Sequence, residues 1–229
     1  MENREKIFQE YYEFNESTML KINELAAHPR EDYFKESFKE ELKFYGVNAI
    51  IMRTMLRYTR YNKSNKIIEF FGDKLRNMKV LDFGCGVGDY GMTIARCGAH
   101  VTFCDFEELI DFVKFRWGKE NLDCDAITSP GSEINQIDPD YNILSACNFN
   151  LVVFGEVLEH INHPLRLLKT FYKVPYIFTS SFPFKREVSF IEPGHNINAY
   201  QEQKQCLEFL ENNCKCHTLI SVLKIWEKH

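Results

Sequence analysis

The sequence of 229 residues lacks the features that would place it in a membrane, outside the cell or on nucleic acid. No apolar run reaches the ~18 residues that a membrane-spanning helix needs. The first residues, Met1 to Lys6, lack the apolar stretch of a secretory signal. The formal net charge is −5, whereas a general nucleic-acid binder usually carries a basic excess. These absences predict a cytoplasmic protein without a membrane partner and make a nucleic-acid partner a minor alternative.

The composition is that of an ordinary soluble globular protein. Apolar residues make up 45% and charged residues 27% of the chain, which is long enough for one α/β domain with an appendage. Eight cysteines are present. We interpret most of them as small buried apolar residues in a reducing compartment. Cys214-Lys215-Cys216-His217 lacks the second ligand pair that a zinc-finger site would need.

The most informative stretch is a strand followed by a glycine-rich turn. Lys79 to Phe83 is apolar enough for a buried strand, and Gly84, Gly86 and Gly88 follow at alternate positions before a helical segment from Tyr90 to Cys97. Glycine permits a tight turn and lets a ligand approach the backbone without interference from a Cβ atom. The N-terminal amides of the next helix favour polar or anionic ligand groups. The stretch therefore predicts a nucleotide-type ligand site.

A second strand, His100 to Cys104, ends at Asp105, where a carboxylate is placed to accept hydrogen bonds from ribose hydroxyls. The glycine turn itself permits two interpretations. Gly86-x-Gly88-x-x-Gly91 fits the dinucleotide fingerprint of NAD(P)-binding oxidoreductases. The fuller pattern Asp82-x-Gly84-x-Gly86-x-Gly88 resembles motif I of class I methyltransferases that depend on S-adenosylmethionine (SAM). A carboxylate at Asp82 would repel a pyrophosphate, so we favour SAM.

The resemblance implies a set of SAM-binding residues from the ends of several strands. They are Asp82, Gly84, Cys85, Gly86, Gly88, Asp105, Phe106, Asp125 and Glu156. Phe106 is expected either against the adenine ring or at the start of a core helix. Asp125, which we place at the end of a third strand, resembles the family's acidic residue near the adenine amino group.

A second motif, Phe154 to Ile161, follows the predicted fourth strand. Glu156, Glu159 and His160 are spaced i, i+3 and i+4, so one helical turn would bring two carboxylates and an imidazole together. The string resembles small-molecule methyltransferases, including the ubiquinone-pathway O-methyltransferases. It also resembles small-RNA 3′-terminal 2′-O-methyltransferases, where it helps to hold a metal ion.

We favour a catalytic role for this motif, in which Glu156, Glu159 or His160 accepts a proton from the acceptor or orients it. A helix start without chemistry is the next alternative. The third is a divalent metal that orients the acceptor hydroxyl, held by Glu156, Glu159, His160 and His195.

Two segments differ in their predicted structure. Residues 1–76 are dense in Phe and Tyr at helical spacing and predict a helical cap or lid. There Arg53, Arg57 and Arg60 share one helix face, either solvated or holding an anionic group of the acceptor. Residues 77–229 alternate strands and helices. They predict a Rossmann-like three-layer sandwich with a mostly parallel sheet, with strands near 79–83, 100–104, 122–126, 149–154 and 174–180 and a shortened C-terminal edge.

The sequence thus predicts a SAM-dependent methyltransferase that acts on a hydroxyl of a small polar acceptor, such as a sugar, a phosphorylated metabolite or a biosynthetic intermediate. N-methylation, RNA 2′-O-methylation and an NAD(P)-binding oxidoreductase are the alternatives, together with a SAM-binding subunit that has no turnover. The oligomeric state has no signal in the sequence.

Overall fold

The computed structural model describes residues 6–7, 10–11, 59–128, 148–180 and 197–229. The chain divides into two compact units, residues 1–60 and residues 61–229, and the description that follows concerns the second unit. The predicted helices between residues 12 and 58 lie outside the described residues. None of the helices among the described residues is both long and apolar enough to cross a membrane.

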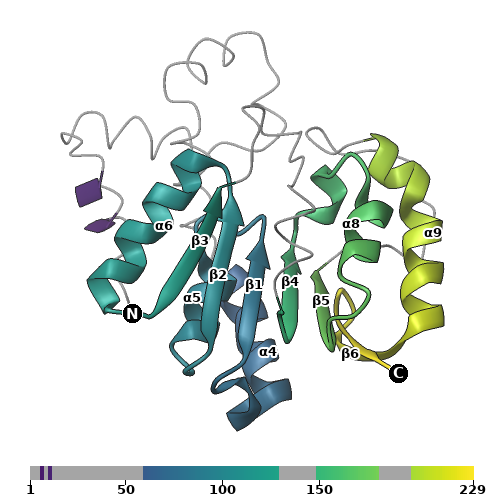
Figure 1. Cartoon of the computed structure of the whole chain (residues 1–229), viewed down its shortest axis with the longest axis horizontal. Coiled ribbons are helices and arrows are strands. Elements are labelled where there is room, and N and C mark those ends of the chain that lie inside the picture. The colour runs from purple at the N-terminus through teal and green to yellow at the C-terminus, as the bar shows by residue number, and fades with distance from the viewer. Residues whose placement is uncertain (1–5, 8–9, 12–58, 129–147, 181–196) are drawn as a thin grey trace, which may run out of the picture. The chain divides into compact units, whose positions relative to one another are not determined.

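The second unit is built on one sheet of seven strands, ordered β3-β2-β1-β4-β5-β7-β6 (Figure 1). The first five strands are parallel, and β7 runs antiparallel to both β5 and β6. The strands are β1 (Lys79–Phe83), β2 (His100–Asp105), β3 (Cys124–Thr128), β4 (Leu151–Gly155), β5 (Tyr176–Ser180), β6 (Cys214–Ile220) and β7 (Leu223–Lys228). This architecture confirms the predicted Rossmann-like fold.

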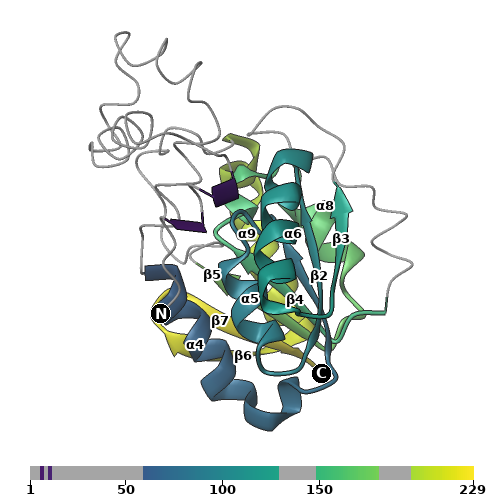
Figure 2. The same ribbon diagram turned by 90° about the vertical axis from the view of Figure 1, so that its left-hand side faces the viewer.

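Helices cover both faces of the sheet (Figures 1 and 2). The described helical elements are α4 (Thr59–Phe71), η2 (Gly72–Leu75), α5 (Asp89–Ala95), α6 (Glu107–Glu120), η3 (Leu158–His160), α8 (Pro164–Thr170) and α9 (Ile197–Asn213). Apolar side chains of α4, α5 and α6 pack on one face, and those of α8 and α9 pack on the other. Side chains alternate between the faces along a strand, so Val80 joins the first core and Leu81 the second.

The described end of the predicted cap packs against the sheet layer. Ile67, Phe71 and Leu75 are buried in the same core as β1 and α5. Residues 61–76 therefore belong to the compact unit that carries the sheet. For residues 1–60, the helical cap stays a prediction.

One strand prediction was shifted and one was wrong. The third strand is present, but it runs from Cys124 to Thr128, two residues later than predicted. The C-terminal edge is not shortened, because β6 and β7 form a complete antiparallel hairpin. The last 16 residues are enough because only Ser221 and Val222 connect the two strands.

The parallel strands place their carboxyl ends at one edge of the sheet. β1 lies between β2 and β4, so the chain order reverses at this point. In open α/β sheets the ligand crevice forms outside the carboxyl ends of the strands at such a reversal. Both sequence motifs follow these strands directly, at Gly84 and at Glu156.

Candidate functional site

The turn after β1 has the left-handed backbone that its glycines predict. Gly84, Gly86 and Gly88 have φ angles of 64°, 57° and 80°, in the left-handed region that side chains disfavour. The amides of Gly84 and Cys85 donate to the Cys104 carbonyl at 2.8 and 3.3 Å, which attaches the turn to β2. Substituted residues at the glycines would strain a turn that lies at the ligand edge of the sheet.

Asp105 connects the end of β2 to this turn. Its Oδ2 accepts a hydrogen bond from the Gly86 amide at 2.7 Å, and its Oδ1 accepts one from the Phe106 amide at 2.8 Å. A carboxylate at the carboxyl end of β2 is a suitable acceptor for ribose hydroxyls. The geometry therefore fits the role that the sequence suggested for Asp105.

Asp82 lies beneath the start of α5. Its Oδ2 accepts a hydrogen bond from the Gly91 amide at 2.8 Å, and the side chain is only 1% exposed. A buried negative charge here opposes a pyrophosphate, which would otherwise use the N-terminus of this helix. It suits a ligand that carries a positive sulfonium, as SAM does. The carboxylates at Asp82 and Asp105 and the open glycine turn thus fit SAM better than a dinucleotide.

The two sequence motifs pack directly against each other. A Cβ atom on Gly84 would lie 2.1 Å from Cγ2 of Val157, and one on Gly155 would lie 2.4 Å from the ring of Tyr90. Both contacts lie far below any van der Waals distance, so only glycine fits at either position. The turn after β1 and the segment after β4 therefore form one continuous surface.

Glu156 is the centre of a polar cluster on this surface. Lys63 Nζ, from α4, donates to Glu156 Oε1, and Ser180 Oγ, at the end of β5, donates to the same oxygen at 2.7 Å. Lys63 Nζ also lies 3.4 Å from Ser180 Oγ. The side chains of Lys63 and Glu156 are 21% and 28% exposed, so the cluster is reachable from solvent.

Glu156 also has an unusual backbone. Its φ of 65° places a non-glycine residue in the left-handed region, which costs of order 1–3 kcal/mol and is found most often at functional sites. The ion pair and the serine hydrogen bond hold the side chain in this position. Sequence reasoning missed Lys63 and Ser180, because neither belongs to a motif and only the fold brings α4 and β5 to Glu156.

The predicted helical turn through Glu156, Glu159 and His160 was wrong. Glu156 turns the chain in the left-handed region, and a short 3₁₀ turn from Leu158 to His160 follows. Glu159 is buried at 4% exposure, whereas Glu156 extends toward Lys63. The i, i+3, i+4 spacing has its predicted meaning only in an α-helix, and the left-handed residue prevents one. The catalytic roles of Glu159 and His160 stay predictions.

Two further residues that were predicted to bind SAM, Phe106 and Asp125, lie in surroundings that differ from those of the glycine turn. Phe106 is buried in the core with Leu81 and Phe83. Asp125 is not at the end of its strand, because β3 continues to Thr128. Its carboxylate lies 2.8 Å from His100 Nε2. Asp105 pairs with Thr128, so Asp125 lies about three residues, or ~10 Å, along the strand from the level of Asp105. The placement of Asp125 near the ligand edge was therefore wrong.

The thiol of Cys85 is unsuited to nucleophilic chemistry. Burial raises its pKa well above the ordinary value, and the nearby Asp105 carboxylate adds to the shift. The thiol therefore stays protonated at neutral pH and packs as a small apolar group.

Among the described residues, no group of three or more His, Cys, Asp or Glu side chains is arranged to hold a metal ion. His195 lies outside the described residues, so the metal alternative stays a prediction. Arg53 and Arg57 also lie outside them. Of Arg60 only the backbone, near the start of α4, is described.

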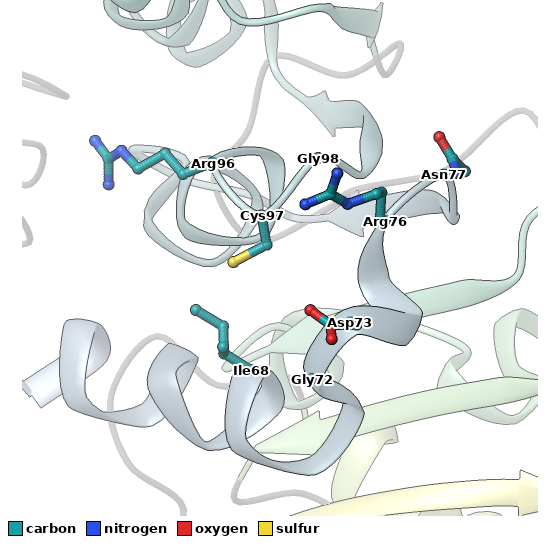
Figure 3. Close-up of a pocket in the computed structure, with 8 residues that line it drawn as sticks. All are labelled: Ile68, Gly72, Asp73, Arg76, Asn77, Arg96, Cys97 and Gly98. Atoms are coloured by element: carbon teal, nitrogen blue, oxygen red, sulfur yellow. The ribbon is translucent and has the colours of Figure 1, made fainter.

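A cavity of about 670 Å³ lies at the opposite edge of the sheet (Figure 3). Its lining includes Asp73, Arg76 and Asn77 before β1, and Arg96 and Cys97 after α5. In Figure 3 the Arg96 side chain points away from the other lining residues; it pairs with Glu120 at 2.7 Å. The cavity is separate from the carboxyl ends of the strands and is not part of the candidate site.

The comparisons with known proteins agree with this geometry. Residues 55–175 match a family described as a methyltransferase domain, which is more than half of the chain. A stretch of 98 residues is 35% identical to the ubiquinone biosynthesis O-methyltransferase of Coxiella burnetii, and it covers 42% of this chain and 38% of that protein. The chain thus matches well under half the length of these curated relatives.

Solved structures show the same fold. An O-methyltransferase family protein from Burkholderia thailandensis has a TM-score of 0.57 at 10% identity, over 98% of this chain and 71% of that one. Magnesium protoporphyrin IX methyltransferase from Synechocystis PCC 6803, with bound S-adenosylhomocysteine (SAH), has a TM-score of 0.51 at 17% identity, over 86% and 95% of the two chains. At these identities the likeness shows the fold alone.

Proposed function

The chain belongs to the methyltransferase domain family, and we propose that it is a SAM-dependent enzyme that methylates a hydroxyl oxygen of a small polar acceptor. The observation that carries the proposal is the Lys63–Glu156–Ser180 cluster at the carboxyl ends of β4 and β5. The cluster adjoins the glycine turn through the contact between Gly84 and Val157.

SAM supplies a methyl group on a sulfonium, a good leaving group, so the protein has mainly to hold and align the reactants. We assign the ribose contact to Asp105 and the close backbone approach to Gly84, Gly86 and Gly88. The buried charge of Asp82 favours the positive sulfonium. Cys85 and Phe106 are buried in the two cores on opposite faces of the sheet.

Glu156 is the residue that we assign to the acceptor. Its carboxylate lies at the carboxyl end of β4, beside the glycine turn, where it is placed to receive the proton of an acceptor hydroxyl. The Lys63 ammonium balances the Glu156 charge. A cationic amine would then gain little from the site, and this favours a hydroxyl acceptor over an amine.

The curated relative supports the same direction. The Coxiella burnetii protein has O-methyltransferase in its name. Because the shared identity covers only part of that relative, the acceptor of ubiquinone biosynthesis is not carried over to this chain.

The test is methyl transfer from radiolabelled SAM to a panel of phenols, catechols, sugars and matching amines, with and without a chelator. Hydroxyl acceptors should be labelled, and amines should not. On a hydroxyl acceptor, Glu156→Gln should lower kcat by ~10²-fold or more, because the amide cannot accept a proton. SAM affinity should stay within about twofold of wild type.

Glu120→Gln is the matched control. Glu120 is also an ion-paired carboxylate, and it is 27% exposed. It lies at the C-terminal end of α6, away from the candidate site, and its partner is Arg96. It should leave kcat unchanged. A near-normal rate in Glu156→Gln would reject this assignment, and a large loss in His160→Ala alone would move the proton acceptor to His160. Labelling of amines alone would overturn O-methylation.

A further inference from the structure

Arg116 connects α6 to the centre of the glycine turn. Its side chain is 1% exposed, and its Nη1 donates a hydrogen bond to the carbonyl of Val87, between Gly86 and Gly88. The same nitrogen lies 3.3 Å from Oδ1 of Asp89, the first residue of α5. One guanidinium thus contacts both the turn and the helix that follows it.

The position of Arg116 in α6 explains this reach. Side chains in a helix point toward its N-terminus, and residues three apart share a face. Val113, one turn earlier, packs on the same turn: a Cβ atom on Gly88 would lie 3.1 Å from Val113 Cγ1. Val113 and Arg116 therefore lie on the face of α6 that contacts the glycine turn. Val113 makes the apolar contact and Arg116 the charged one.

The electrostatics of this contact require an arginine. Asp89 is 3% exposed and would be a costly buried charge without a cation, and Val87 is fully buried, so its carbonyl needs a donor. A guanidinium presents several N–H donors in a fixed plane and serves both groups. A lysine has a point charge on a flexible stem and does not reproduce that geometry.

The helix that carries Arg116 also begins just after Asp105, the carboxylate that we assign to the ribose contact. Asp105 ends β2, and α6 starts at Glu107, so α6 is anchored beside Asp105 at one point and holds Val87 at another. Asp105 in turn accepts a hydrogen bond from the Gly86 amide. Resting on the proposed function, we propose that Arg116 is a positioning residue for SAM: it fixes the glycine turn relative to Asp105 and does not touch the ligand.

The test uses two arginines that join the same pair of helices. Arg116 contacts the N-terminal end of α5, whereas Arg96, just after α5, pairs with Glu120 at the far end of α6. Arg116→Lys and Arg96→Lys make the same chemical change at these two ends. SAM and SAH affinities are measured by calorimetry well below the melting temperature, and hydrogen exchange is followed at the Gly86 and Gly88 amides.

For Arg116→Lys we expect the Kd of SAM and of SAH to rise about tenfold or more and the two glycine amides to exchange faster, since their turn is less fixed. Arg96→Lys should change neither quantity. A folded Arg116→Lys protein with Kd within twofold of wild type, or an equal effect of Arg96→Lys, would overturn the proposal.

A second variant covers the case in which Arg116→Lys does not fold. Arg116→Met combined with Asp89→Leu removes both buried charges together but still deprives the Val87 carbonyl of its donor. We expect this protein to fold, to bind SAM weakly and to exchange the Gly86 and Gly88 amides quickly. Wild-type affinity in this variant, or failure of both variants to fold, would reject a positioning role in favour of a purely structural one.

Discussion

Asp105 and Asp125 show how one residue type acquires different roles from its place in a strand. Both are aspartates on neighbouring parallel strands, but Asp105 ends β2 beside the glycine turn, whereas Asp125 is the second residue of β3 and contacts His100. Only the first lies at the edge where parallel strands of this fold present ligands.

This difference predicts unequal effects on SAM binding. Asp105→Asn keeps the shape of the side chain but replaces one acceptor oxygen with a donor, which conflicts with the Gly86 amide or with a ribose hydroxyl. We expect the Kd of SAM, measured by calorimetry, to rise by about tenfold or more. Asp125→Asn should leave the Kd unchanged, and an equal loss in both variants would reject the role of Asp105 as a ribose contact.

At the scale of elements, α5 and α6 each contain a glycine inside the helix, in opposite surroundings. Gly91 of α5 faces the sheet, where a Cβ atom would lie 2.3 Å from the Phe103 ring and 2.9 Å from Asp82 Oδ2. Gly118 of α6 has nothing within 4 Å of the same position. The first glycine permits close packing of helix on sheet, and the second has no such role.

Alanine substitutions at the two glycines should therefore have opposite signs. Gly91→Ala inserts a methyl group against the fully buried Phe103 and should destabilise the protein by ~1–3 kcal/mol. Gly118→Ala should stabilise it by ~0.5–1 kcal/mol, because alanine restricts the unfolded chain and favours the helix. Urea unfolding of both variants gives the two values, and a stabilised Gly91→Ala protein would contradict the packing described for α5.

At the scale of the whole molecule, the ligand choice follows from the arrangement of buried charge around one edge of the sheet. Asp82 of β1 and Asp89 of α5 are both buried beside the start of α5, where Asp89 pairs with Arg116 and Asp82 accepts a hydrogen bond from the Gly91 amide. The buried Asp82 carboxylate favours a ligand with a positive centre over one with a pyrophosphate.

A thermal-shift series tests this at the level of the intact chain. A ligand at about 100 times its Kd adds ~2.7 kcal/mol of stability, which raises Tm by roughly 5–10 °C for a domain of this size. SAM and SAH should give such a shift, and NADH should give none. A shift with NADH alone would contradict the assignment of the cofactor, whichever acceptor the enzyme uses.

The sequence alone determined the features that depend on neighbouring residues. The buried strand β1, the glycine turn and the carboxylate that ends β2 all follow from local apolar runs, from backbone freedom at glycine and from the spacing of strands in a βαβ unit. The parallel sheet with helices on both faces follows from the alternation of elements. Since these signals are local in sequence, they are readable without coordinates.

Only the tertiary structure decided which distant side chains meet at the site. Lys63 comes from a helix 93 residues before Glu156, and Arg116 lies 29 residues after Val87; neither belongs to a motif. The left-handed backbone of Glu156, which breaks the expected helical turn, accompanies its contacts with Lys63 and Ser180. Long-range contacts of this kind depend on how helices pack on the sheet, and the local pattern of residues carries no record of that packing.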